Sequence, residues 1–144
     1  MTPFRTRGVV STICLAHVLV GCESSSNPVA PSSVPFTVTD IVVGSGVEAT
    51  NGDNVSVDYA GWLYDPTRPQ NKGVQFDSSE GQGFAFILGI GSVIAGWDQG
   101  VVGMRVGGVR QLLIPPELGY GAVGFGPVPP DATLVFDIEL LNVQ

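Results

Sequence analysis

The chain has 144 residues, a formal net charge of -7 at pH 7 and only six lysines and arginines. Its length suits one domain with a real hydrophobic core, and its acidic balance offers no basic surface for phosphates, so nucleic acid is not an expected partner. Because the single histidine and both cysteines lie within the first 22 residues, a domain that follows them has no imidazole or thiolate for nucleophilic catalysis, zinc binding or a disulfide, and we expect no metal and no cofactor.

Residues 1–21 have the pattern of an export signal. Two arginines give a positive start, and the apolar run over 9–20 is too short to span a bilayer, which needs about 20 apolar residues. The run ends in "LVGC", which resembles the bacterial lipoprotein box, where cleavage precedes the cysteine and that cysteine receives a lipid. An ordinary secretory signal and a buried N-terminal helix are the alternatives. The first interpretation predicts an exported protein anchored to a bacterial membrane through Cys22, on its periplasmic or cell-surface side.

The segment 22–35 reads as a flexible tether. After Cys22 it runs "ESSSNPVAPSSVP", rich in serine and proline and without apolar periodicity. Such a composition buries too little surface to offset the entropy of ordering. We expect it to hold a domain of residues 36–144 clear of the membrane.

From residue 36 onward the pattern is that of β-strands. "VSVDYAGWLY" alternates apolar with polar or small residues, as in a half-buried sheet, while "DPTRPQNKG" at 65–73 holds two prolines and should be an exposed loop. The strands expected are 36–43, 55–64, 74–77, 84–88, 109–115 and 133–143. In the last of these, one face alternates with the other: Leu134, Phe136, Ile138 and Leu140 should point inward, and Thr133, Val135, Asp137 and Glu139 outward.

One short helix is expected within 92–104. Val93, Ile94, Trp97 and Val101 recur there at helical spacing, despite glycines that cost about 1 kcal/mol each inside a helix. The pattern therefore predicts an α+β domain, an antiparallel sheet curled around one short α-helix.

Five segments in register resemble one known family. "VDYAGWL", "FDSS", "VIAGWDQGVVGMRVGG", "IPPELGYG" and "VPPDATLVFDIELL" occur in this order, and residues 36–143 are similar to the FKBP-type peptidyl-prolyl cis-trans isomerases (rotamases). That family folds as an antiparallel β half-barrel wrapped around a short α-helix. The resemblance implies an enzyme of protein folding that acts on proline-containing, unfolded or extended polypeptides, and a basin that also accepts macrolides such as rapamycin.

The resemblance also implies which residues form the apolar basin for the proline ring. Trp97 would be its floor, Ile94 would offer a backbone N–H to a substrate carbonyl, and Tyr120 a hydroxyl. The full set of matching positions is Tyr59, Phe76, Asp77, Phe84, Val93, Ile94, Trp97, Tyr120, Val128 and Phe136. The alternative for the aromatic residues is plain core packing, and for Asp77 a structural role in its turn.

Two departures from the family pattern bear on this site. The arginine that often follows the Phe-Asp pair is missing from "SSEGQG", so Asp77 should lack its cation and keep only the Tyr59 hydroxyl as partner. The loop after Tyr120 is shortened and holds Phe125. A non-catalytic holdase or peptide-binding module and a lipid-anchored β-barrel carrier of small ligands remain the rival functions.

Overall fold

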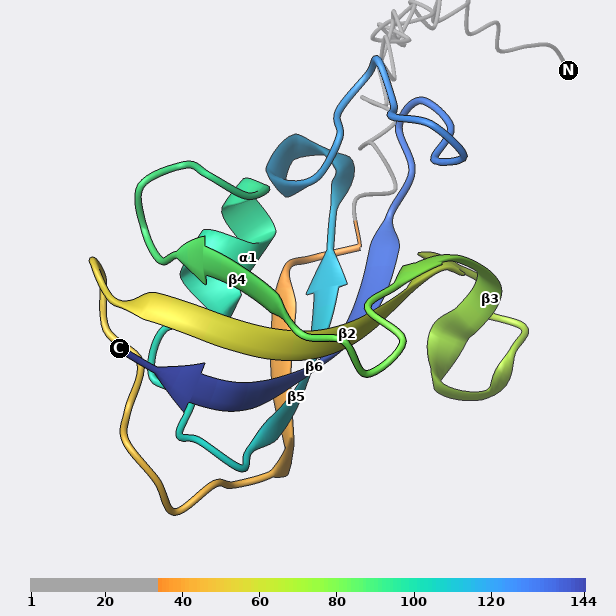
Figure 1. The fold of residues 1–144 in the computed structure, drawn as a ribbon. Helices are drawn as coiled ribbons and strands as arrows, with labels where there is room; N and C mark the ends of the chain where they lie inside the picture. The colour runs from red at the N-terminus through yellow and green to blue at the C-terminus, as the bar shows by residue number, and fades with distance from the viewer. Residues whose placement is uncertain (1–33) are drawn as a thin grey trace, which may run out of the picture.

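The computed structural model describes residues 34–144, so the predicted signal peptide, Cys22 and most of the tether lie outside the described residues. One six-stranded antiparallel sheet dominates the fold, with strand order β1-β5-β6-β2-β3 and β4 paired to β2 (Figure 1). The elements are β1 Thr37–Val42, β2 Asn54–Tyr64, β3 Lys72–Ser78, β4 Phe84–Ile87, α1 Ala95–Gly100, β5 Val109–Ile114 and β6 Leu134–Val143, with short 3-10 turns at Pro69–Asn71 and Pro116–Leu118. The predicted α+β class, an antiparallel sheet with one short helix, is confirmed.

The glycines of α1 let the helix lie directly on the sheet. A Cβ at Gly96 would come within 2.6 Å of Ile114, and one at Gly100 within 2.6 Å of Leu112, both side chains of β5. The low helix propensity of glycine is therefore the cost of close packing. The helix is shorter than its apolar spacing suggests, because the residue at its N-cap, Ile94, is extended at φ -58° and ψ 148°.

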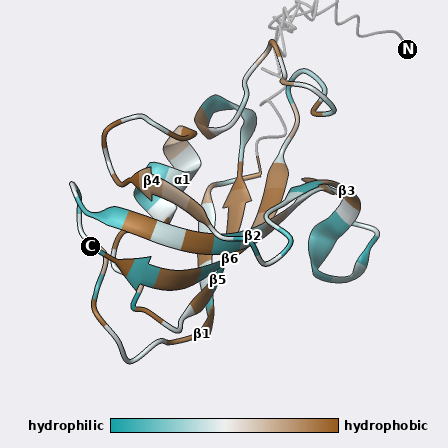
Figure 2. Ribbon diagram, in the orientation of Figure 1, coloured by the Kyte–Doolittle hydropathy of each residue, from teal (hydrophilic) through white to brown (hydrophobic). Residues whose placement is uncertain are grey.

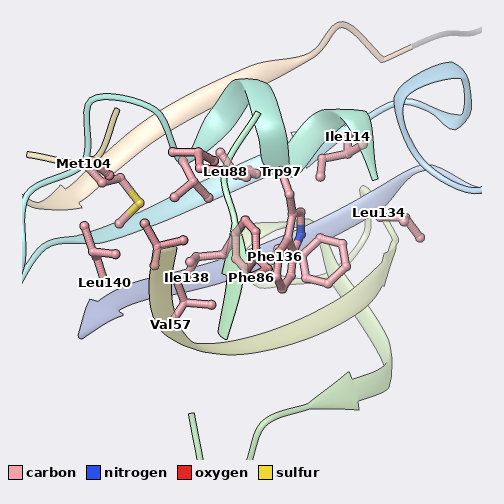
Figure 3. Packing of buried hydrophobic residues seen from close by; sticks show 14 of the residues in the cluster. Val57, Phe86, Leu88, Trp97, Met104, Ile114, Leu134, Phe136, Ile138 and Leu140 are labelled. Atoms are coloured by element: carbon pink, nitrogen blue, oxygen red, sulfur yellow. The ribbon is translucent and has the colours of Figure 1, made fainter. Parts of the chain in front are cut away.

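The core lies between α1 and the sheet, where Figure 3 shows its side chains. Figure 2 shows hydrophobic residues along β2, β4 and β6. The predicted inward residues of β6, Leu134, Phe136, Ile138 and Leu140, are all at most 2% exposed. Val135 was expected on the solvent side, and it is also buried, at 1%. It lies in the middle of the sheet, between its partners Leu113 on β5 and Trp62 on β2.

The predicted loop at 65–73 is shorter than expected, because β3 begins at Lys72 rather than Val74. Lys72 pairs with Tyr64 of β2, and its ammonium contacts the Asp137 carboxylate and lies 4.5 Å from the centre of the Trp62 ring. These contacts extend the strand beyond its apolar residues. No helix within 34–144 is long and apolar enough to cross a membrane.

Candidate active site

A cavity of about 570 Å³ opens at one end of the core, beside α1 and β4, whose Trp97 and Phe86 rings are in contact. Its lining is mainly aromatic and aliphatic. The lining residues are Tyr59, Asp77, Phe84, Ser92, Val93, Ile94, Trp97, Tyr120, Phe125 and Phe136. Eight of the ten predicted basin positions are therefore brought together around one cavity.

Trp97 forms the centre of the basin. It is 5% exposed, and its ring meets the rings of Tyr59 at 4.9 Å, Phe136 at 5.2 Å and Phe86 at 5.6 Å between centroids. The first two contacts are edge-on, the geometry that aromatic pairs prefer. Figure 3 shows Trp97 reaching from α1 to Phe86 and Phe136. Its indole N–H is buried without a hydrogen-bond partner among the described residues, so the floor of the basin holds one unpaired donor.

Two residues outside the predicted basin set, Phe125 and Ser92, also line the cavity. Phe125, 68% exposed, stacks on the Tyr120 ring at 5.2 Å and 15°. The chain turns between them, with Gly124 at φ 72° and its N–H donating to the Tyr120 carbonyl at 3.2 Å, and Phe125 then forms a bridge with Val128. Ser92 lines the wall and donates to the Ile87 carbonyl at 2.9 Å. A lone serine in a Gly-Ser turn carries no sequence signal for such a place.

Phe76 and Val128 do not line the cavity. Phe76 packs edge-on against Phe136 at 5.5 Å between ring centroids, and Val128 is 3% exposed within the hydrophobic core. Their assignment to the basin came from the family resemblance, which matches positions in the sequence and does not define the lining of this cavity. Phe76 therefore supports the basin through its contact with Phe136.

The hydrogen bond expected between Tyr59 and Asp77 is present. The Tyr59 hydroxyl donates to Asp77 Oδ2 at 2.8 Å. Burial, together with this hydrogen bond and the nearby carboxylate, raises the pKa of Tyr59 to about 12. Burial and then the Asp77 charge also raise the pKa of Tyr120. Both phenols are therefore neutral donors at physiological pH.

Asp77 has no cationic partner within 34–144, as expected from the missing arginine. Each of the four lysines and arginines in this range pairs with another carboxylate. The pairs are Arg68 with Asp65, Lys72 with Asp137, Arg105 with Glu48 and Arg110 with Asp40.

The basin offers apolar surface and hydrogen-bond donors rather than a nucleophile. Its polar side chains are those of Tyr59, Asp77, Ser92 and Tyr120. Within the described part of the chain, no group of three or more histidine, cysteine, aspartate or glutamate residues could hold a metal ion. Such a site can bind an apolar ring and orient an adjacent carbonyl.

Comparison with known proteins identifies this arrangement. The family model described as FKBP-type peptidyl-prolyl cis-trans isomerase matches residues 46–141. The FK506-binding protein of Neisseria meningitidis serogroup B is 48% identical over 109 residues, covering 74% of this chain and 94% of the relative. The Arabidopsis thaliana peptidyl-prolyl cis-trans isomerase FKBP53 is 47% identical over 126 residues, 85% of this chain and 25% of that protein. The crystal structure of AtFKBP13 superimposes with a TM-score of 0.65 at 38% identity, covering 76% of this chain and 93% of that one.

Proposed function

We propose, from the premise that this chain belongs to the FKBP-type peptidyl-prolyl cis-trans isomerase family, that it accelerates rotation about X–Pro bonds of exported polypeptides by desolvating the twisted amide. The observation that carries the mechanism is the cavity itself, an aromatic basin with neutral donors and a single carboxylate.

Rotation about an X–Pro bond must overcome about 18 to 20 kcal/mol of amide resonance, yet it makes no bond and transfers no proton. The twisted amide has less charge separation than the planar one. An apolar basin therefore penalises the transition state less than the ground state, and each 1.4 kcal/mol or so of that difference raises the rate about tenfold.

The individual side chains take roles that fit this mechanism. The proline ring would lie on Trp97, with Phe136 and Tyr59 as walls. The Ile94 backbone N–H and the Tyr120 hydroxyl would hold flanking carbonyls, since both belong to residues that line the cavity. Asp77 holds Tyr59 in place through the 2.8 Å hydrogen bond.

A protease-coupled proline-isomerisation assay tests this function. The full chain with Cys22→Ser, which cannot be lipidated, should accelerate the cis-to-trans step of a Leu-Pro peptide, and the same chain with Trp97→Ala should not. Peptide binding without acceleration would favour the holdase alternative. A macrolide such as rapamycin should bind in the basin, which a titration of the tryptophan fluorescence would detect. It should also inhibit the reaction in the coupled assay.

We also propose that the chain is exported and anchored to the membrane by a lipid on Cys22. The "LVGC" ending and the Ser/Pro segment behind it support cleavage before Cys22 and attachment of lipid there. Labelling of cells with a radioactive fatty acid should mark the wild-type chain and spare Cys22→Ser. Label on the variant, or a mature chain that starts elsewhere, would contradict it.

A further inference from the structure

The Asp77 carboxylate lines the basin and has no cationic partner within 34–144. Asp77 is an exposed residue. Its Oδ2 accepts the Tyr59 hydroxyl, while Oδ1 has no hydrogen-bond partner within 34–144. Every lysine and arginine of that range is engaged with a different carboxylate.

No other group that lines the cavity can carry charge at neutral pH. The only other titratable lining residues are Tyr59 and Tyr120, and both phenols titrate above their ordinary range. The surrounding field has the same sign as Asp77, because residues 34–144 hold twelve acidic and four basic side chains, 4 - 12 = -8. A peptide in the basin therefore meets one local negative charge on an acidic domain.

We infer that Asp77 makes this site selective for proline peptides with a lysine or arginine beside the proline, and against those with an aspartate or glutamate. The inference rests on the proposed isomerase function and specifies its substrate class. A cationic side chain would supply the partner that Asp77 lacks, whereas an acidic one would be repelled by a like charge.

The expected size of the effect follows from Coulomb's law in water, since Asp77 is exposed. Two unit charges about 4 to 8 Å apart change an equilibrium or rate by a factor of about 2 to 5. Attraction of lysine and repulsion of glutamate multiply, so kcat/KM should differ about 4-fold to 25-fold between the two peptides at low salt. The ratio should shrink at about 1 M salt, where the Debye length is about 3 Å.

The test uses the full chain with Cys22→Ser and two peptide series, with lysine, glutamine or glutamate either before or after the proline. Asp77→Asn removes the charge and keeps an oxygen that can accept from Tyr59. Glu139→Gln is the matched control, because Glu139 is exposed on β6, lies outside the basin lining and carries the same charge.

In at least one series, the ratio of kcat/KM for the lysine peptide to that for the glutamate peptide should fall to about 1 to 3 in Asp77→Asn. The same ratio should stay at the wild-type value in Glu139→Gln. Equal ratios in wild type and Asp77→Asn, or a ratio that Glu139→Gln lowers as much, would overturn the inference while leaving the isomerase function intact. Absence of turnover with the neutral glutamine peptides in wild type would instead refute the proposed function. Should Asp77→Asn fold poorly, a wild-type ratio that does not respond to salt overturns the inference by itself.

Discussion

Gly61→Ala should disturb the basin through a single methyl group. Gly61 lies in β2 directly across from Phe136 of β6, and the Phe136 ring leans over it. A Cβ at Gly61 would come within 2.6 Å of Phe136 Cε1 and 2.9 Å of Phe76 Cζ. Real Cβ atoms do not approach carbon this closely, so at least one ring must move.

The loss of stability caused by that movement can be estimated from the packing around Phe136. Phe136 is 2% exposed and is fixed by edge contacts with Trp97 at 5.2 Å and Phe76 at 5.5 Å. Overpacking of this kind typically costs about 1 to 3 kcal/mol. For a domain of this size the melting temperature should fall by about 4 °C per kcal/mol. Because Phe136 lines the cavity, its displacement should also lower kcat/KM.

Urea unfolding and the protease-coupled assay measure the two effects on the same protein. Phe76→Leu removes ring atoms behind the wall, so it should partly restore both stability and activity in the Gly61→Ala background, a non-additive result. Ala60→Ser is the control, because it adds one heavy atom to the neighbouring residue of the strand, which points to the opposite face, and should cost less than about 0.5 kcal/mol. Wild-type stability in Gly61→Ala, or purely additive losses in the double variant, would refute the reasoning.

Three further outcomes are expected. Trp97→Ala should lose most isomerase activity and about 3 to 5 kcal/mol of stability in urea unfolding, because it empties the floor of the basin; retention of half the activity would contradict the mechanism. Since the pKa of Tyr59 is raised from 10.0 to about 12, its contribution to stability is fully present below pH 10 and is lost as the pH rises toward 12; the stability difference between wild type and Tyr59→Phe should shrink over that window and nowhere below it. Lys72→Met should lower the free energy of unfolding by about 1 to 3 kcal/mol, because it leaves the half-buried Asp137 carboxylate without its cation; the activity per folded molecule should change little, and a large loss of kcat would contradict a purely supporting role.

The sequence predicted the sheet well because strand signals are local. Alternation placed the inward residues of β6 correctly, and β-branched runs located all six strands to within about two residues. Val135 escaped the rule because the middle of a sheet can be covered on both faces, which depends on neighbouring strands. The start of α1 was not predicted, because Ile94 carries no capping side chain. The apolar spacing of the helix therefore continues into residues that precede it.

The candidate site was predicted by motif rather than by physics alone. Tyr59 and Asp77 are 18 positions apart in the sequence, and only the pairing of β2 with β3 brings their side chains to 2.8 Å. The Tyr120–Phe125 stack follows a turn with positive φ at Gly124. The apolar periodicity of the sequence does not predict such a stack. Phe76 and Val128 were assigned to the basin by the family resemblance, and in this structure they lie beside the cavity rather than in its lining.

The basin is the open end of the hydrophobic core, and this fixes how activity and stability are linked. Trp97 and Phe136 are 5% and 2% exposed, yet both line the cavity, so the same atoms pack the core and would contact the proline. Substitutions there must change both properties together. Phe125 and Asp77 lie on the exposed rim, where few core contacts are lost, so their substitution can change substrate preference at nearly constant stability. Sequence changes at the rim can therefore alter the preferred proline contexts, while the floor stays fixed by the requirements of folding.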